Sequence, residues 1–175
     1  MRQEGLDFGI HYRLNTDELG TFNFGVDGNQ LISFTQQNQT PGAVPVTIVD
    51  GDNNGRETGI ELTALASVGW RLNPFSAQLQ VQFGHPYSIA NSNFPYNLAG
   101  PGRPAGVQHV GALYNANLHV TYDMPGEWFT GAGMRVFANL NNILNTRPPY
   151  GDNTGGAVGG NPIGREVILG FSKEF

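Results

Sequence analysis

Hydrophobic and polar residues alternate with a period of two along most of this chain. The pattern runs through seven stretches, at residues 6–14, 22–34, 60–72, 78–83, 114–122, 134–141 and 167–175, with Leu65 as a misfit. Because neighbouring side chains of a strand point to opposite faces, the alternation predicts seven strands, each with an apolar and a polar face. Most of the stretches approach or exceed the roughly 9–11 residues of a strand that crosses a bilayer at a tilt. Strands of soluble proteins are usually about 5–6 residues long.

The connections between these stretches alternate between short and long. Residues 15–20, 73–76 and 125–130 form short connections, whereas residues 36–56, 84–111 and 145–164 form long ones. Alternate connections of an up-and-down sheet lie at opposite ends, so all short turns are expected at one end and all long loops at the other. Outer-membrane barrels have this asymmetry, with short periplasmic turns and long extracellular loops. The sequence therefore predicts an all-β fold, an antiparallel up-and-down meander of about seven long strands in a transmembrane β-barrel.

Faces and ends of the strands follow from the same pattern. Parity predicts that one set of side chains faces lipid (Leu62, Val68, Leu79, Val81, Leu118 and Val120) and another the lumen (Gln80, Asn117 and His119). Aromatic residues gather near the strand ends, as they do at a membrane–water interface. Tyr12, Trp70, Tyr122, Trp128 and Phe175 fall on the short-turn side, and Phe34, Phe83 and Tyr114 on the long-loop side.

The composition narrows the possible classes of protein. Charged residues make up 13% of the 175 residues, where about 25% is usual, and Gly occurs 25 times. No run of about 18 apolar residues occurs, which excludes a helical membrane protein. A net charge of -5 without a Lys/Arg cluster argues against nucleic-acid binding. The absence of Cys excludes disulfides and thiolate metal sites.

Three segments resemble the late barrel strands of TonB-dependent outer-membrane receptors. Residues 20–34 (GTFNFGVDGNQLISF) resemble a late strand pair, residues 135–144 (RVFANLNNIL) the penultimate strand, and residues 164–175 (GREVILGFSKEF) the last strand with its terminal Phe. The resemblance implies energy-coupled uptake of a siderophore, vitamin or oligosaccharide across the bacterial outer membrane. It also implies a plug domain and a TonB complex that acts through an N-terminal segment. Neither the plug nor that segment occurs in residues 1–175, so we expect the chain to be the C-terminal segment of such a barrel.

The last strand carries a second expectation from the same resemblance. Val167, Leu169, Phe171 and Phe175 are expected to form the signal that the barrel-assembly machinery recognises, by strand pairing. Lys173 occupies the remaining position of this lane, where a long basic side chain can snorkel to the interface. Lipid and the assembly machinery are thus the expected partners, and the small-molecule ligand is not specified.

Chemical motifs point to no enzyme and no cofactor. Residues 50–61 (DGDNNGRETGIE) have the spacing of an EF-hand calcium loop, but the flanking residues are extended rather than helical. An ordinary Asp/Asn/Gly turn is the favoured interpretation, with a calcium loop of another kind left open. His11, His85, His109 and His119 have no metal-ligand spacing, although His11 and His119 lie on the polar face. No nucleophile motif or carboxylate pair stands out.

Two other functions remain open from the sequence. A passive porin-like barrel would share the strand pattern. A soluble β-sandwich binding module would share the alternation, but it would explain neither the strand length nor the sorted loops.

Overall fold

The computed structural model describes residues 2–36, 46–47, 60–90, 107–124, 133–147, 150–151, 156–157 and 163–173. Within these ranges the secondary structure is all-β, and there is no helix long and apolar enough to cross a membrane. The strands are β1 (Arg2–Thr16), β2 (Gly20–Gln36), β3 (Val46–Thr47), β4 (Leu62–Leu72), β5 (Phe75–Gly84), β6 (Tyr87–Ala90), β7 (Val107–Val110), β8 (Leu113–Met124), β9 (Met134–Asn141), β10 (Tyr150–Gly151), β11 (Gly156–Ala157) and β12 (Glu166–Lys173).

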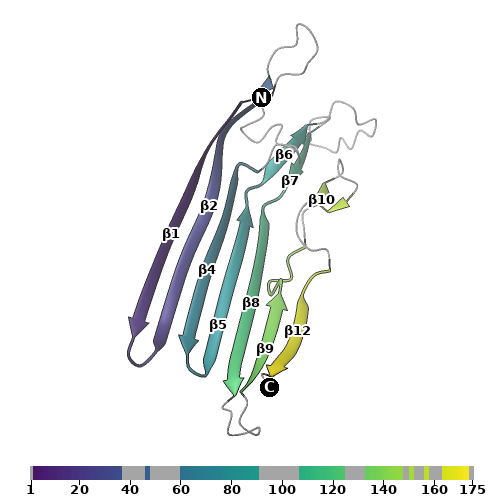
Figure 1. The fold of residues 1–175 in the computed structure, drawn as a ribbon. Helices are drawn as coiled ribbons and strands as arrows, with labels where there is room; N and C mark the ends of the chain where they lie inside the picture. Colours follow the sequence, from purple (N-terminus) through teal and green to yellow (C-terminus); the bar gives the residue numbers. More distant parts are fainter. Residues whose placement is uncertain are drawn as a thin grey trace.

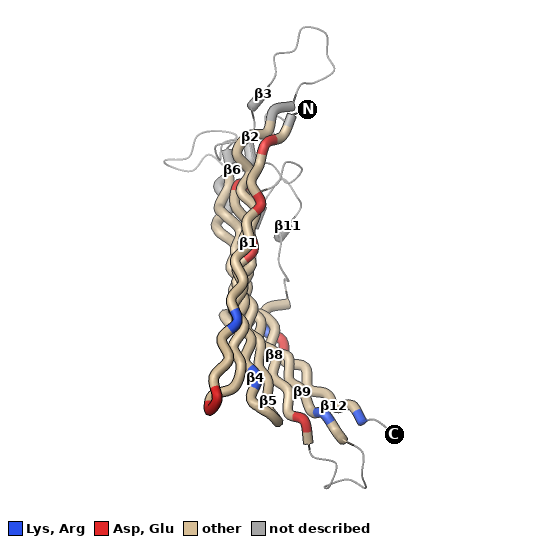
Figure 2. Tube along the Cα trace, turned by 60° about the vertical axis from the view of Figure 1, so that its left-hand side comes forward, with Lys and Arg blue, Asp and Glu red and all other residues tan. Residues whose placement is uncertain are grey.

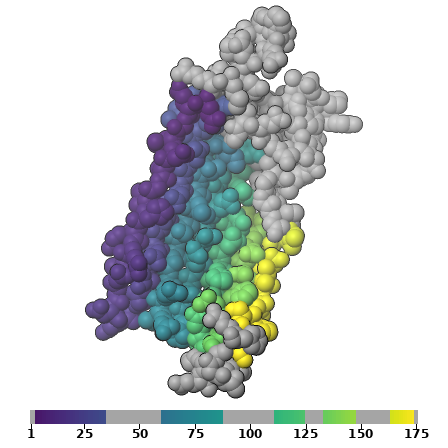
Figure 3. Space-filling view, in the orientation of Figure 1, coloured from purple at the N-terminus to yellow at the C-terminus, as the bar shows by residue number. Residues whose placement is uncertain are grey.

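Seven of these strands form one antiparallel meander. Their order is β1-β2-β4-β5-β8-β9-β12, so each strand pairs with the next long strand of the chain (Figure 1). The predicted meander and its seven strand positions are confirmed. The sheet is not closed, because β1 and β12 lie at its two ends. The strands lie side by side as one continuous slab (Figure 3).

Short and long connections lie at opposite ends of the sheet. The ends of β1, β4 and β8 that lead into the short connections point to the lower end in Figure 1, and the ends of β2, β5 and β9 that lead into the long connections point to the upper end. Gly20 closes the first turn with a φ of 82°, a conformation that Gly adopts without strain. Thr16 Oγ1 donates a 2.7 Å hydrogen bond to the carbonyl oxygen of Gly20 across this turn.

The strand register separates the two faces of the sheet, with Leu65 and Phe137 as large hydrophobic residues in the polar rows. Val68, Leu79 and Leu118 are cross-strand neighbours, as are Ser67, Gln80 and Asn117 one row away. Directly paired residues of antiparallel strands point to the same face. The sets that the sequence predicts for opposite faces therefore do lie on opposite faces, although the contact of one face with lipid remains a prediction.

The sheet is a single layer with few buried side chains. Figure 2 views it nearly edge on, where the lower ends of β8, β9 and β12 splay away from β1. The buried hydrophobic side chains in the described ranges are Leu31, Phe34, Tyr87 and Ala116. The two other sheets of the described residues, β6-β7 and β10-β11, have two strands each and make no extensive contact with the seven long strands. The described part of the large sheet is held together mainly by pairing between neighbouring strands.

Local irregularities change the strands from their predicted form. The register shifts between Glu4 and Gly5, which leaves Ile32 as the unpaired extra residue of β2. Ile32 is consequently 58% exposed although it shares its parity with Phe34, which is buried. β9 has the predicted bounds, and the described part of β12 begins one residue earlier than predicted, while residues 174–175 lie outside the described residues. Short strand pairs, β6-β7 and β10-β11, occur in the long connections, where the sequence predicted loops.

Candidate functional site

The apolar face of the sheet is exposed to its surroundings. Ile10 at one end of the sheet is 72% exposed, and Leu169 at the other is 75% exposed. Between them, Val26, Val68 and Tyr114 are 41%, 40% and 48% exposed. A soluble monomer rarely leaves a continuous apolar surface larger than a few hundred Å² in water. This face is therefore an extended apolar surface that no other described element covers.

The predicted assembly signal lies partly within the described residues. Val167, Leu169 and Phe171 project from one face of β12, where they pair with Leu140, Ala138 and Val136 of β9. Val167 is 58% exposed and Phe171 is 75% exposed. Phe175 lies outside the described residues. The structure thus brings three of the four residues into one exposed row at an edge of the sheet.

The aromatic residues near the strand ends are only partly as predicted. Trp70 is held beside the first turn, because its Nε1 donates a 2.8 Å hydrogen bond to the carbonyl oxygen of Leu19. Phe83 and Tyr114 contact each other near the long-connection end, with ring centroids 5.3 Å apart. Phe34 lies at the predicted end of the sheet but is 2% exposed, so it is a buried residue rather than a surface aromatic. Trp128 lies outside the described residues.

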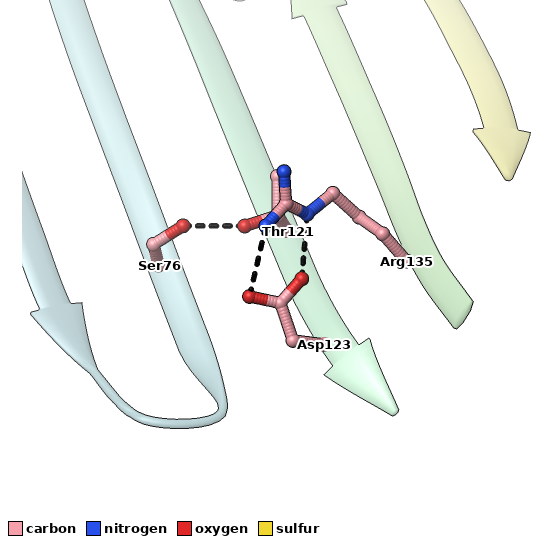
Figure 4. Close-up of polar contacts among 4 residues, drawn as sticks. All are labelled: Ser76, Thr121, Asp123 and Arg135. Atoms are coloured by element: carbon pink, nitrogen blue, oxygen red, sulfur yellow. Dashed lines mark hydrogen bonds and ion pairs between the residues drawn. The ribbon is translucent and has the colours of Figure 1, made fainter. Parts of the chain in front are cut away.

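The polar face carries pairs of cross-strand hydrogen bonds. Arg135 of β9 donates from Nε to Asp123 Oδ1 at 2.5 Å and from Nη2 to Oδ2 at 3.1 Å (Figure 4). Ser76 and Thr121 are hydrogen-bonded one row above, between β5 and β8. The Asp123 carboxylate thereby neutralises the Arg135 guanidinium in a bidentate ion pair.

A hollow of about 580 Å³ opens on the polar face in the half near the short turns. Gly69 leaves open space in its floor, whereas Ser67 and His11 occupy the space over Gly25. The polar residues of its lining are His11, Arg13, Asn23, Ser67, Arg71, Ser76, Gln78 and His119, and Tyr12, Phe24, Trp70 and Ala77 also contribute. The four strands β1, β2, β4 and β5 supply most of this lining, and β8 adds His119.

Two histidines at this hollow have hydrogen-bond partners. His11 Nε2 lies 3.0 Å from Asp27 Oδ1, and both side chains are more than half exposed. His119 is hydrogen-bonded to Asn139 on the neighbouring strand β9. Both lie on the polar face, as predicted. Parity indicated their face, but the carboxylate and the amide beside them follow only from the register.

A compact loop after β9 explains the Asn-Asn motif of residues 141–142. Asn142 has a φ of 50° and is 5% exposed. Its side-chain amide exchanges two hydrogen bonds with the Thr146 backbone, at 2.8 and 2.9 Å. Its backbone N–H donates to Asn117 Oδ1 at 2.9 Å. The motif is therefore a structural stop for the strand.

Metal and calcium sites have no support in the described residues, where no group of three or more His, Asp or Glu side chains gathers. The calcium-like loop, residues 50–61, lies outside the described residues apart from Ile60 and Glu61. Glu61 accepts a 3.3 Å hydrogen bond from Gln30, and its Oε2 lies 3.7 Å from His85 Nδ1. The side chain of His109 is likewise outside the description.

Comparison of the chain with protein-family models, curated proteins and solved structures found no match.

Proposed function

We propose that this chain forms part of the wall of a bacterial outer-membrane β-barrel, namely the C-terminal part of a TonB-dependent receptor for energy-coupled uptake. The carrying observation is the separation of faces over seven strands, with an exposed apolar face and a polar face behind it. A barrel wall in lipid needs this arrangement, with apolar side chains outward and polar ones toward the lumen.

Energetics favour lipid over water for the apolar face. Burying one Val, Leu, Ile or Phe side chain contributes about 1.5–3 kcal/mol. Ile10, Leu169 and Phe171 are each more than 70% exposed. In water these side chains therefore contribute little of that burial free energy. Lipid on this face recovers the contribution without a second protein layer.

The open edges of the sheet indicate what else the barrel needs. β1 and β12 each have one long partner strand, so their outer backbone groups face the surroundings. Lipid does not satisfy such groups, and bacterial barrels have at least 8 strands in a closed ring. Further strands between β12 and β1 would close the wall.

The receptor assignment is narrower than the barrel assignment and rests on the resemblance of residues 135–144 and 164–175. In the first of these segments, the hydrogen bonds of the Asn142 side chain explain why an Asn follows the strand at this position. A siderophore, vitamin or oligosaccharide is the proposed class of cargo, and an enzymatic activity is not part of the proposal.

Because the chain alone has two open edges, the test is to export the product of the full-length parent gene to the periplasm of a Gram-negative host and to separate the membranes. We expect this product in the urea-resistant outer-membrane fraction. A soluble periplasmic monomer would contradict the barrel. The DNA upstream of the Met1 codon provides a separate test of the receptor assignment. We expect an in-frame plug domain there, whereas further barrel strands without a plug would indicate a passive porin.

A further inference from the structure

The charged side chains of the polar face are sorted along the strands. Asp7, Asp27 and Glu61 lie toward the long connections, and Glu166 lies level with His11. Arg13, Arg71 and Arg135 all lie nearer the short turns by their register positions. Acidic residues occur there too: Asp123 is paired with Arg135, and Asp17 and Glu18 lie in the first turn, between β1 and β2. Arg13 and Arg71 are the permanently charged side chains in the lining of the hollow itself.

Arg13 and Arg71 keep most of their hydrogen-bonding capacity unused. Arg13 donates from Nε to Asn15 Oδ1 at 3.2 Å, which leaves its terminal N–H groups. Neither arginine has a carboxylate within ion-pair distance among the described residues. Both are exposed, and both line the hollow. They provide two cations on one concave surface without a direct ion pair, and the Asp123 carboxylate lies within electrostatic range of Arg71.

The register places the two arginines on either side of the glycine floor. Arg13 pairs with Asn23, and Asn23 pairs with Gly69, so Arg13 is two strands, or about 10 Å, from Gly69. Arg71 is two residues beyond Gly69 on the same face of β4. A Cβ added at Gly69 would meet only Asn23 atoms, the nearest at 3.8 Å. The space above Gly69 is therefore open, with the Asn23 side chain between it and Arg13.

The remaining lining combines uncharged hydrogen-bonding groups and two histidines with Tyr12, Phe24, Trp70 and Ala77. Asn23, Ser67, Ser76 and Gln78 offer amides and hydroxyls, which suit hydroxyl groups of a ligand. The aromatic residues beside the hollow, such as Trp70, belong to the apolar face of the sheet. Stacking on a neutral sugar ring is consequently not what the hollow offers.

We infer that this hollow binds a small anion that carries carboxylate and hydroxyl groups, held between Arg13 and Arg71. The planar guanidinium fork matches a carboxylate in two parallel hydrogen bonds, and the two arginines are far enough apart to take separate carboxylates of one molecule. The inference deepens the proposed function and rests on it, because the polar face meets a transported solute only in a barrel wall.

The experiment measures citrate binding by calorimetry to the full 175-residue chain, refolded in detergent micelles at low ionic strength. Circular dichroism confirms β-structure beforehand. We expect saturable citrate binding that is weakened by added salt, with inorganic phosphate and sucrose at least about tenfold weaker. An absence of citrate binding to the β-structured chain would overturn the inference. So would phosphate or sucrose binding as tight as that of citrate.

Variants of the chain distinguish citrate binding at this hollow from nonspecific attraction of anions to positive charge. R13Q and R71Q are each expected to weaken citrate binding about tenfold, and R71K less, because Lys keeps the charge but not the fork. K173Q removes the same charge from the other face of β12 and is the matched control. G69V fills the floor while it leaves both arginines in place, and it is expected to abolish binding.

Each result then decides the inference. Equal citrate binding by R13Q, R71Q and K173Q would contradict the site, as would unchanged binding by G69V. Citrate binding in micelles by the chain, with the full-length product absent from the outer-membrane fraction, would sink the proposed function but leave the hollow as an anion site. Membrane insertion without citrate binding would support the proposed function and overturn the anion site.

Discussion

Asn142 ends β9 through both its backbone and its side chain. Its left-handed φ of 50° suits Asn and Gly, and its buried amide holds the Thr146 backbone. Asn142→Ala should lower the free energy of unfolding by about 3 kcal/mol, as the sum of two lost hydrogen bonds and the backbone strain of a left-handed Ala. Asn142→Gly removes only the hydrogen bonds and should cost about 2 kcal/mol. Urea unfolding of the chain in detergent micelles measures both. Wild-type stability in the two variants would show that this loop does not stabilise the strand end.

Gly170 has no side chain, and this leaves room for the aromatic ring of a neighbouring strand. The Phe137 ring of β9 lies over Gly170 of β12, and an added Cβ would overlap the ring. Gly170→Ala should therefore destabilise the chain by about 1 kcal/mol, since the ring must move from its position. Gly69→Ala is the matched control, because its Cβ meets no atom closer than 3.8 Å. The measurement is a double-mutant cycle with Phe137→Leu, which should remove the penalty at Gly170. A penalty that persists without the ring would assign it to the backbone instead.

At the scale of the strands, alternation predicted where each long strand lies. It works for β8, whose apolar and polar residues alternate through the paired part of the strand, and for β4 apart from Leu65. It fails at Ile32, where a bulge inserts an extra residue that no period shows in advance. It predicts the bounds of β9, although the hydrogen bonds of Asn142 to Asn117 and Thr146 that follow the strand could not be predicted from hydrophobicity. Strands of two residues, such as β3 and β10, are too short to have a period at all.

Adjacent residues of β8 test which face meets lipid. Val120 lies on the apolar face and His119 on the polar face, at nearly the same depth in the sheet. Val120→Lys should cost about 2–4 kcal/mol if that position lies near the bilayer midplane, whereas His119→Lys should be nearly neutral. The measurement is the fraction of chain that folds into phospholipid vesicles as urea is diluted. Equal tolerance of lysine at the two positions would argue against the membrane assignment.

At the scale of the whole molecule, the sheet places together residues that are distant in sequence. The sequence assigns Arg13 and Arg71 to polar faces, but only the pairing of β1 with β2 and β2 with β4 puts them around Gly69. The hollow therefore could not be predicted, since a shift of one residue in either pairing would send one arginine to the other face. The meander could be predicted, because neighbours in sequence pair throughout it.

The edge strand β12 is where the whole molecule would meet its assembly machinery. Val167, Leu169 and Phe171 form an exposed row on a strand with one edge free, which is the form needed for recognition by strand pairing. We expect deletion of Phe175 combined with Phe171→Ser to lower the amount of folded barrel severalfold. The measurement is the heat-modifiable species in outer-membrane fractions, made from the full-length parent gene. Ile168→Ser alters the same strand on its opposite face and should assemble normally, because it leaves the row intact. Undiminished assembly of the Phe171 and Phe175 variant would rule out this row as the signal, and a loss as large in Ile168→Ser would trace the defect to weakened pairing with β9.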